Sequence, residues 1–580
     1  MLTYQATKRF DSLFLFWLVL LLAMLTGCGA LDDYKRVSAL LRAHPEVFQA
    51  VTASGELQDY FEKGTLKDPI SSNGELFGYD ETPDLALRGP LHLGLVRYYD
   101  SQAALQGYTS SALGRNWMHN FDAKLLPPTV PNPNVVTVQL FHTNFINFNK
   151  GQLNYPVDQP YQLAATANGY QFMSPVTRLV YSFDSSGNLT SIADRNGNTA
   201  TVTRAAGAPG PAQVTDGLGR TLTFAYTGSN LTKVADQSGR SVSYEYSGGL
   251  LSAFTDANGK RTTYAYTTAT FLLGNPLTAL MTSATRPQGN KPLSQTYIAQ
   301  GQSGGQVATQ YDSFGDTTSL DYSHPSGGAT ITQPLGVTFS QSNGTDQDLV
   351  SETDASGASS LYTWDSNDHK IGVTDKLGNR TSATYDPASK MPATITDELG
   401  NATTFTYTPT VQGPFTFYDL TSVRFADGTS IAIARDARGN ILSFTDQAGQ
   451  KWQTTRNARG QIATLTIPSG AVTTFAYNQD GTLASVQLDS GDKYAISYDA
   501  ISRPIAITEP DGNTVRAQYD AVSSRTQATN EKGNNTSAAY DGNNNRTAVR
   551  PGCVLRLGIR YQRPSGFFHR SRRKNGHHRL

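Results

Sequence analysis

Carboxylates that could bind metal ions recur along the chain in a fixed context, the tetrad Asp-x-x-Gly. The first two tetrads begin at Asp184 and Asp194, and three more begin at Asp216, Asp236 and Asp256, 20 residues apart. Asp and Gly repeats bind Ca²⁺ in β-rolls, but that motif repeats about every nine residues around a GGxGxD core, which is absent here. Asp also suits the first position of a type I turn, and Gly suits the fourth. We therefore interpret the tetrads as turns.

Other residues that could do chemistry are few. The chain has no GxxxxGK[ST], HExxH or CxxC motif, and its nine histidines are scattered. His92, His119 and His142 lie on strand-like segments, where a packed or exposed side chain is the expected state. Glu509 and Asp511 form a carboxylate pair, but they belong to a turn and no pocket is indicated beside them. We predict no catalytic residue, no metal ligand and no cofactor, and hence a protein that is not an enzyme.

The residues between the tetrads define the elements that must position them. Tyr477, Tyr498, Tyr519 and Tyr540 are each separated by 21 residues, and a fixed period of this kind is typical of stacked repeats. Two turn signals about ten residues apart divide each repeat into two strands of about five or six residues. Each repeat is therefore predicted to be an antiparallel β-hairpin. The pattern fades in residues 268–308, 323–350 and 408–420, where we expect longer loops or degenerate copies.

Tyrosine at the end of a strand has two possible roles. The segment Tyr498–Asp520 opens and closes on Tyr-Asp, which places a large β-favouring ring directly before a turn. Rows of such rings on neighbouring strands would each contribute about 0.5–1 kcal/mol as cross-strand pairs. Alternatively, some rings line a surface and stack on sugars, which would make the array a carbohydrate-binding surface.

Composition favours β-structure and argues against one class of partner. Aromatic residues make up 10% of the chain and charged residues only 16%, which fits a turn-rich, all-β chain. The formal net charge is +0, but residues 551–580 hold eight of the 47 Lys and Arg residues and no Asp or Glu. The remainder thus has 47 − 8 = 39 basic against 47 acidic groups, a net charge of −8. An acidic body lacks the basic surface that nucleic acids need, so we expect no nucleic-acid partner.

Two features together resemble the RHS (rearrangement hotspot) or YD-repeat family, which includes teneurin-type proteins. The first is an N-terminal segment with DLALRGPLHLGLVRYYDS (Asp84–Ser101) and LGRNWMHNF (Leu113–Phe121). The second is the Tyr-Asp and Asp-x-x-Gly array over Tyr181–Asn545. The resemblance implies a small β-rich module followed by a long sheet of hairpins that spirals into a hollow or partial shell. In that family the shell encloses a C-terminal toxin or decorates the cell surface.

The N-terminus predicts export and lipid anchoring. Lys8 and Arg9 precede a continuously apolar run, Leu13–Leu25, which is shorter than the about 20 residues of a membrane span. The run ends in Leu-Thr-Gly-Cys at Cys28, which resembles the lipobox of bacterial lipoproteins. The resemblance implies cleavage before Cys28 and lipid attachment to its thiol, which would anchor the chain stably. Glycine after the cysteine favours the outer membrane, and a plain signal peptide or a short uncleaved anchor is the alternative.

We divide the chain accordingly into five segments. They are a signal peptide (1–27), a lipid-anchored linker with short helices (28–67), the RHS N-terminal β-rich module (68–180), the repeat array (181–550) and a basic tail (551–580). The tail loses its acidic residues, the Tyr-Asp register and the turn signals together. We expect it to be disordered or out of frame, so that the array stops before the core motif and toxin of the family. A basic segment that binds nucleic acid or anionic lipid, or the remnant of an effector, is the alternative. Cys553 is interpreted as a bystander.

Three functions fit these observations. The first is a cell-envelope lipoprotein whose β-shell binds or encapsulates a partner at the cell surface without catalysis. The second is a toxin-delivery protein of contact-dependent bacterial competition that lacks its effector, the C-terminal toxin cargo being encoded elsewhere. The third is a carbohydrate-binding surface protein. All three share a membrane partner, contacted through the lipid on Cys28.

Overall fold

The structure, a computed structural model, describes residues 83–550 except 105–106, 109–110, 129–133, 141–144, 150–151, 154–158, 272–273, 324–327 and 345–347. Several predictions lie outside these residues. They are the signal peptide (1–27), Cys28 with its lipid, the linker (28–67) and the basic tail (551–580) with Cys553.

The N-terminal module consists of short antiparallel strands. β1 pairs with β2, β3 pairs with β4, and β5 to β8 form a separate sheet. Their bounds are β1 Leu85–Leu87, β2 Leu93–Leu95, β3 Arg97–Tyr99, β4 Trp117–His119, β5 Lys124–Leu126, β6 Val135–Gln139, β7 Phe145–Asn149 and β8 Gln152–Leu153.

All later strands belong to one antiparallel sheet, the wall, in which each strand pairs with its neighbours in the sequence. The first half of the wall comprises β9 Gln162–Thr166, β10 Gly169–Ser174, β11 Leu179–Asp184, β12 Leu189–Ala193, β13 Thr199–Thr203, β14 Gln213–Thr215, β15 Thr221–Thr227, β16 Asn230–Asp236, β17 Ser241–Ser247, β18 Leu250–Thr255, β19 Arg261–Phe271, β20 Asn275–Thr285, β21 Leu293–Tyr297, β22 Val307–Asp312, β23 Thr317–Asp321, β24 Thr330–Thr332, the 3-10 turn η2 Pro334–Gly336, β25 Thr338–Asn343 and β26 Leu349–Asp354.

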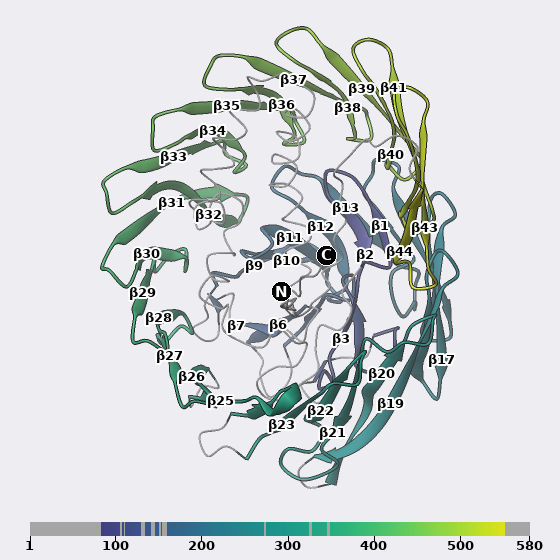
Figure 1. Cartoon of the computed structure of the whole chain (residues 1–580), viewed down its shortest axis with the longest axis vertical. Helices are drawn as coiled ribbons and strands as arrows, with labels where there is room; N and C mark the ends of the chain where they lie inside the picture. Colours follow the sequence, from purple (N-terminus) through teal and green to yellow (C-terminus); the bar gives the residue numbers. More distant parts are fainter. Residues whose placement is uncertain are drawn as a thin grey trace, which may run out of the picture.

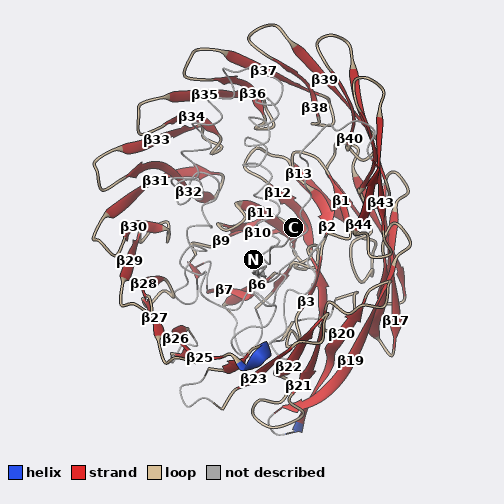
Figure 2. Ribbon diagram, viewed as in Figure 1, coloured by secondary structure: helices blue, strands red, loops and turns tan. Residues whose placement is uncertain are grey.

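The second half continues the same hairpins. It comprises β27 Ser359–Trp364, β28 Lys370–Thr374, β29 Arg380–Tyr385, β30 Pro392–Thr396, β31 Ala402–Gln412, β32 Phe415–Arg424, β33 Ser430–Arg435, β34 Ile441–Thr445, β35 Lys451–Arg456, β36 Ile462–Thr466, β37 Val472–Tyr477, β38 Leu483–Gln487, β39 Lys493–Tyr498, β40 Pro504–Thr508, β41 Thr514–Tyr519, β42 Arg525–Thr529, β43 Asn535–Tyr540 and β44 Arg546–Arg550. The described chain is therefore nearly all strand (Figure 2), which confirms the predicted all-β fold.

The tetrads form turns, as their residue types predicted. Asp194 Oδ1 accepts the backbone N–H of Asn196 at 2.8 Å and of Asn198 at 2.9 Å, and Gly197 has a φ of 84°. A left-handed φ is strained for residues with a Cβ, so the glycine is required by the backbone rather than by a ligand. The carboxylate holds the turn closed from within.

Long strands and loops both occur where the pattern fades. Residues 408–420 lie in the hairpin β31–β32, and residues 268–285 lie in β19–β20; both hairpins have strands of 10 or 11 residues. The remainder of 268–308 includes the loops 286–292 and 298–306 on either side of β21. The sheet itself begins at β9, ahead of the first tetrad.

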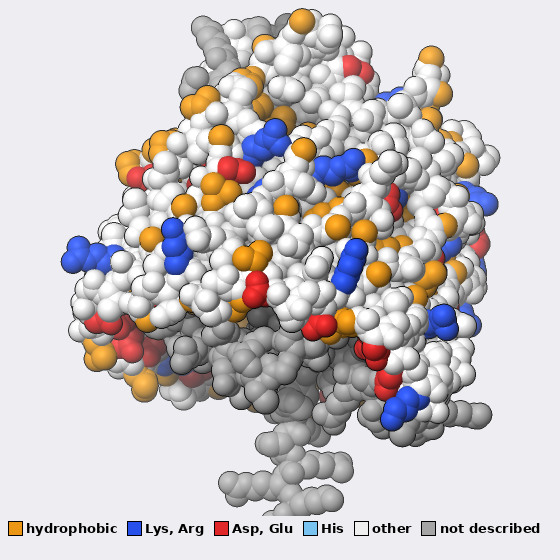
Figure 3. Space-filling model, turned by 90° about the horizontal axis from the view of Figure 1, so that it is seen from above, with side chains coloured by type: hydrophobic (Ala, Val, Ile, Leu, Met, Phe, Trp, Pro, Cys, Tyr) orange, Lys and Arg blue, Asp and Glu red, His pale blue; other side chains and the backbone are white. Residues whose placement is uncertain are grey.

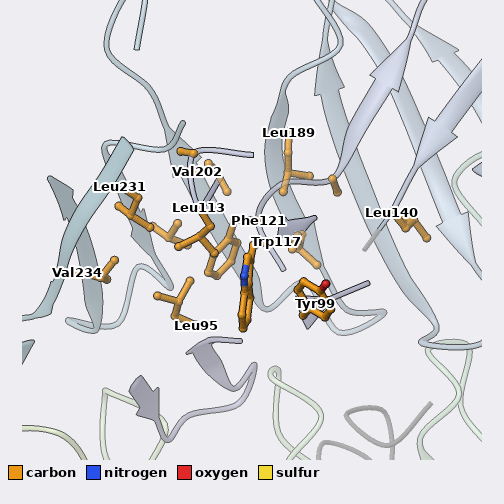
Figure 4. Close-up of a cluster of buried hydrophobic side chains, with 14 of the residues drawn as sticks. Leu95, Tyr99, Leu113, Trp117, Phe121, Leu140, Leu189, Val202, Leu231 and Val234 are labelled. Atoms are coloured by element: carbon orange, nitrogen blue, oxygen red, sulfur yellow. The ribbon is translucent and has the colours of Figure 1, made fainter. Parts of the chain in front are cut away.

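The wall winds around the N-terminal module (Figure 1). Its last strands, β41 to β44, come back beside strands of the first winding, because hydrogen bonds there join residues 281 to 288 positions apart. The largest buried cluster lies between module and wall, where Trp117 and Phe121 of the module face wall residues such as Leu231 and Val234 (Figure 4). The module therefore supplies the core that the first winding lacks on its own.

Candidate functional site

The recurring tyrosines form a ladder of hydrogen bonds on the inner face of the wall. Each phenol donates to a backbone carbonyl 15 residues earlier, at or beside the start of the preceding strand, over 2.6–3.0 Å. The tyrosine rungs, donor first, are Tyr226 to Pro211, Tyr246 to Leu231, Tyr266 to Leu251, Tyr322 to Val307, Tyr385 to Lys370, Tyr407 to Pro392, Tyr477 to Ile462, Tyr498 to Leu483, Tyr519 to Pro504 and Tyr540 to Arg525.

Other residues replace tyrosine at three rungs and keep the same bond. Trp364 donates its indole N–H to Leu349, and the guanidinium groups of Arg435 and Arg456 donate to carbonyls that are also 15 residues earlier. The register shifts at these positions, which marks a β-bulge where regular pairing is interrupted. A long side chain with a donor at its tip is thus what the position requires, because it satisfies a carbonyl beside the bulge.

The ladder hydroxyls act as donors and keep their protons. Burial raises the pKa of Tyr477 to about 12, although the charge of Arg456 opposes the shift. Burial also raises the pKa of Tyr498, above the usual range. Because each tip bonds the backbone and each ring is at least partly buried, the ladder favours the structural role of these tyrosines over sugar stacking.

Removing one rung is expected to destabilise the wall modestly. Tyr498→Phe deletes the 2.9 Å bond to Leu483 O and should lower the free energy of unfolding by about 1–2 kcal/mol, because a partly buried carbonyl loses its donor. Tyr498→Arg should retain more stability than the phenylalanine variant, since arginine makes the equivalent bond from Arg435 and Arg456. Urea unfolding of the three proteins tests this order, and a phenylalanine variant as stable as the parent would contradict it.

A buried ion pair fastens the N-terminal module to the wall. The Arg97 guanidinium binds both carboxylate oxygens of Asp84, at 2.5 and 2.9 Å, and donates to the hydroxyl of Tyr264 at 3.1 Å. The hydroxyl of Tyr244 donates to Asp84 at 2.7 Å, and Arg97 lies 4.1 Å from the ring centre of Phe254. Burial alone would lower the pKa of Arg97, but Asp84 and the tyrosines raise it well above its usual value. Three strands of the wall, β17 to β19, and strand β3 of the module therefore meet at one charged cluster.

The module makes further contacts with the same part of the wall. The indole of Trp117 donates to the hydroxyl of Tyr266 at 2.9 Å. The hydroxyl of Tyr99 donates to the carbonyl of Ala279 at 2.8 Å and accepts the N–H of Met281 at 2.7 Å. Buried polar groups bonded in this way fix the position of the module relative to β19 and β20.

A second feature, which we call the seam, joins the two windings of the wall. The carboxylate of Asp419 on β32 bonds the guanidinium groups of Arg195 and Arg178, which lie 224 and 241 residues earlier. Asp419 and Arg195 are almost fully buried. A Cβ at Gly439 would lie 2.1 Å from the Arg195 guanidinium, so the turn that begins at Asp436 must carry glycine to let the windings approach.

Successive turns continue the seam around the wall. Arg220, in the turn between β14 and β15, donates to the carbonyl of Asp480 and to the hydroxyl of Ser502. Arg240, one repeat later, donates to the carbonyl of Ala521 at 2.9 Å, and Asn258 donates to Asp520 at 3.0 Å. Turns of the first winding thus meet turns of the second, one repeat at a time.

The described residues contain no group of three or more His, Cys, Asp or Glu side chains that could hold a metal ion. A Gly-x-Ser-x-Gly pattern does occur in the sequence, at Gly301–Gly305. It lies in the loop between β21 and β22 rather than in the strand-to-helix turn that activates a nucleophile. Among the same residues, no helix is long and apolar enough to span a membrane.

Charged side chains are dispersed on one outer face of the molecule. On the face shown in Figure 3, Lys and Arg lie scattered among Asp, Glu and uncharged residues, and neither kind gathers in a broad patch. The lipid-attachment residue predicted from the sequence, Cys28, is not among the described residues. The ladder, the module cluster and the seam were not predicted as sites.

Comparisons with known proteins add the following. Residues 67–139 match a family described as DUF6531, a domain of unknown function, and no curated protein matches. Similar solved structures include the Tc holotoxin pore of Photorhabdus luminescens (12% identity, TM-score 0.36, 77% of this chain and 25% of that chain). They also include a TcdB2-TccC3-TEV structure (13%, 0.37, 84% and 32%). The chain thus spans about a quarter to a third of the length of these two.

Proposed function

We propose that the chain is a shell protein of the RHS or YD-repeat type that encloses a polypeptide and has no catalytic activity of its own. The observation that carries the proposal is that the wall is fastened at two places. The buried pair Arg97 and Asp84 of the module bonds Tyr264 and Tyr244 of the wall, and Asp419 joins the two windings by binding Arg195. Buried, paired charges at both places hold a fixed enclosure rather than a flexible surface. Residues 67–139, which overlap the segment that resembles the RHS N-terminal module, match the DUF6531 family. This match supports the assignment.

The shell proposal is tested by asking whether the protein shields a polypeptide. An unstructured reporter peptide is fused to the C-terminus of the full chain, and its digestion by proteinase K is compared with that of the free peptide. We expect digestion to be at least about tenfold slower in the fusion, because a protease cannot enter a packed sheet. Equal rates would overturn the proposal.

We further propose that the shell is exported and anchored at the outer membrane through the lipid on Cys28. Lipobox-like residues at the end of an apolar run support this, and several acyl chains would give stable membrane attachment. Cys28→Ser should abolish labelling by an alkyne fatty acid and release the protein from the membrane fraction. Labelling that persists in the serine variant would remove the anchor.

A further inference from the structure

One edge of the wall carries the turns that follow the even-numbered strands, since alternate turns of an antiparallel sheet lie at the same edge. The first part of this edge forms the seam. In the turns between β12 and β13 and between β20 and β21, the third residues are Asn196 and Gln288, which bond Asn440 and Asn543 of the second winding. The third residue of a turn at this edge is therefore the position that meets a neighbouring winding.

The same edge continues past the seam. Among the described residues, the last hydrogen bond between the windings joins Asn543 to Asn290 at 2.7 Å. The next five turns along the edge begin at Asp312, Gln333, Asp354, Asp375 and Asp397. In the described chain they make no hydrogen bond to the second winding. The edge therefore lies open from β22 to β31.

Large apolar side chains occupy the third position in four of these five turns. Phe314, Leu335, Leu377 and Leu399 are between 81% and 89% exposed, and only Ser356 interrupts the row. Single exposed apolar residues are common, but a row of them is typical of a contact surface. We call these four residues the apolar rim.

The turns themselves do not require these apolar residues. Ser356 holds the same position, and later turns of the same edge have small or polar third residues, namely Asp427, Ala448, Ser469, Ser490, Asp511 and Lys532. Leu218 holds the position in a turn of the seam, where its side chain is only partly exposed. Leucine at this position is thus largely covered where a second winding is present, which favours a contact role for the apolar rim.

Carboxylates flank the apolar rim. The turns 312–316, 333–337, 354–358, 375–379 and 397–401 together hold six Asp and Glu residues and one Lys, a net charge of 1 − 6 = −5. Hydrogen bonds from Asn379 and Asn401 lower the pKa of Asp375 and of Asp397, so both carboxylates stay charged at neutral pH. A complementary partner should therefore combine apolar side chains with basic ones.

The basic tail, residues 551–580, has this composition. It holds eight Lys and Arg residues and no Asp or Glu. Near its start, Leu557, Ile559 and Tyr561 alternate with Arg556, Gly558 and Arg560. In an extended chain this alternation turns apolar side chains to one side and basic ones to the other. The tail can therefore offer both kinds of contact at once.

The tail also begins close enough to reach the apolar rim. The turn before β44 contacts Gln288 through Asn543, directly before the edge opens. β44 is about 17 Å long, and the five open turns span eight strand spacings of about 4.8 Å, roughly 38 Å. The 30 residues after Arg550 can extend over up to about 100 Å. They suffice to return along β44 and to follow the rim.

We propose that the basic tail, residues 551–580, binds along the apolar rim, with its apolar side chains on Phe314, Leu335, Leu377 and Leu399 and its basic side chains beside the carboxylates. The tail then continues the seam past Asn290 and covers the open edge of the first winding. The inference does not depend on the proposed shell function. It gives a partner within the chain to a segment for which the sequence alone predicts disorder.

The test measures how fast trypsin cuts the tail of the full chain, followed by mass spectrometry of the tail fragments. A free peptide of residues 551–580 gives the rate for an unbound tail. We expect the tail of the parent to be cut at least about tenfold more slowly, because a bound segment must dissociate before it is cut. The triple variant Phe314→Ser, Leu377→Ser and Leu399→Ser should be cut about as fast as the free peptide.

A matched control separates the rim from other exposed apolar residues. Leu361→Ser, Val411→Ser and Leu442→Ser remove three such side chains elsewhere on the wall and should leave the tail protected. The rim variant should keep the urea midpoint of the parent, since serine already occupies this turn position at Ser356.

Four results would overturn the proposal. They are a parent tail that is cut as fast as the free peptide, slow cleavage that persists in the rim variant, and protection in the parent that disappears on dilution, which would assign the rim to a second copy of the chain. The fourth is a tail that is protected only when vesicles of phosphatidylglycerol are added, which would identify a lipid-binding segment instead.

Discussion

Replacing Arg97 by alanine is expected to lower the free energy of unfolding by about 3–5 kcal/mol, because it leaves a buried carboxylate without its cation. The side chains of Arg97 and Asp84 are only 4% and 3% exposed. In the variant, Asp84 keeps the hydroxyl of Tyr244 but loses both guanidinium bonds. Urea unfolding followed by tryptophan fluorescence measures the change, since Trp117 lies 5.3 Å from the guanidinium carbon.

The wall contains a matched control for this effect. Arg261 and Glu245 form an ion pair of the same bidentate kind, with both bonds at 2.8 Å, but their side chains are 48% and 50% exposed. Solvent screens such a pair, so Arg261→Ala should cost at most about 1 kcal/mol. Equal losses in the two variants would mean that Arg97 does not fasten the module as the structure indicates.

The hairpin array could be predicted because its determinants are local. An Asp such as Asp194 closes its own turn within four residues, and the glycine three places later, Gly197, meets a local requirement for positive φ. Neither depends on how the sheet curves. For the same reason the composition and the 21-residue step sufficed to predict the fold class.

The role of the tyrosines could not be read from one repeat, because the acceptor carbonyl belongs to the preceding strand. A signal was nevertheless present. Arg435, Arg456 and Trp364 replace tyrosine in register, and the property that the three residue types share is a long side chain with a donor at its tip. A position whose role was ring stacking would be less suited to arginine than a position that needs a hydrogen-bond donor.

The seam was beyond sequence analysis for a geometric reason. Which turns meet depends on how many strands complete one winding, and that number follows from the accumulated twist of the sheet rather than from any motif. Arg195 and Asp419, 224 residues apart, carry no mark that pairs them.

The seam supplies the second large prediction, which concerns acid. Burial by itself would raise the pKa of Asp419, but the charges of Arg178 and Arg195 outweigh it and lower the pKa below its ordinary value of 3.8, and Arg435 acts in the same direction. A group whose pKa is lowered by folding stabilises the protein above its unfolded pKa and loses that contribution as the pH falls through the folded value. The seam should therefore hold at pH 7 and weaken below about pH 4.

Asp419→Asn removes the charge at every pH, so it should behave at pH 7 as the parent behaves in strong acid. We expect a loss of about 3–5 kcal/mol at pH 7, because buried guanidinium groups remain without a counter-charge. The loss should shrink toward zero as the pH falls below the folded pKa of Asp419, where the parent carboxylate is protonated as well. Hydrogen exchange of the backbone amides in β31 to β36 measures this loss of stability locally.

Other carboxylates also titrate in acid, but they do so in both proteins, so the difference in stability between parent and variant isolates the contribution of Asp419. A difference that stays constant from pH 7 to pH 2 would mean that the ion pair does not join the windings.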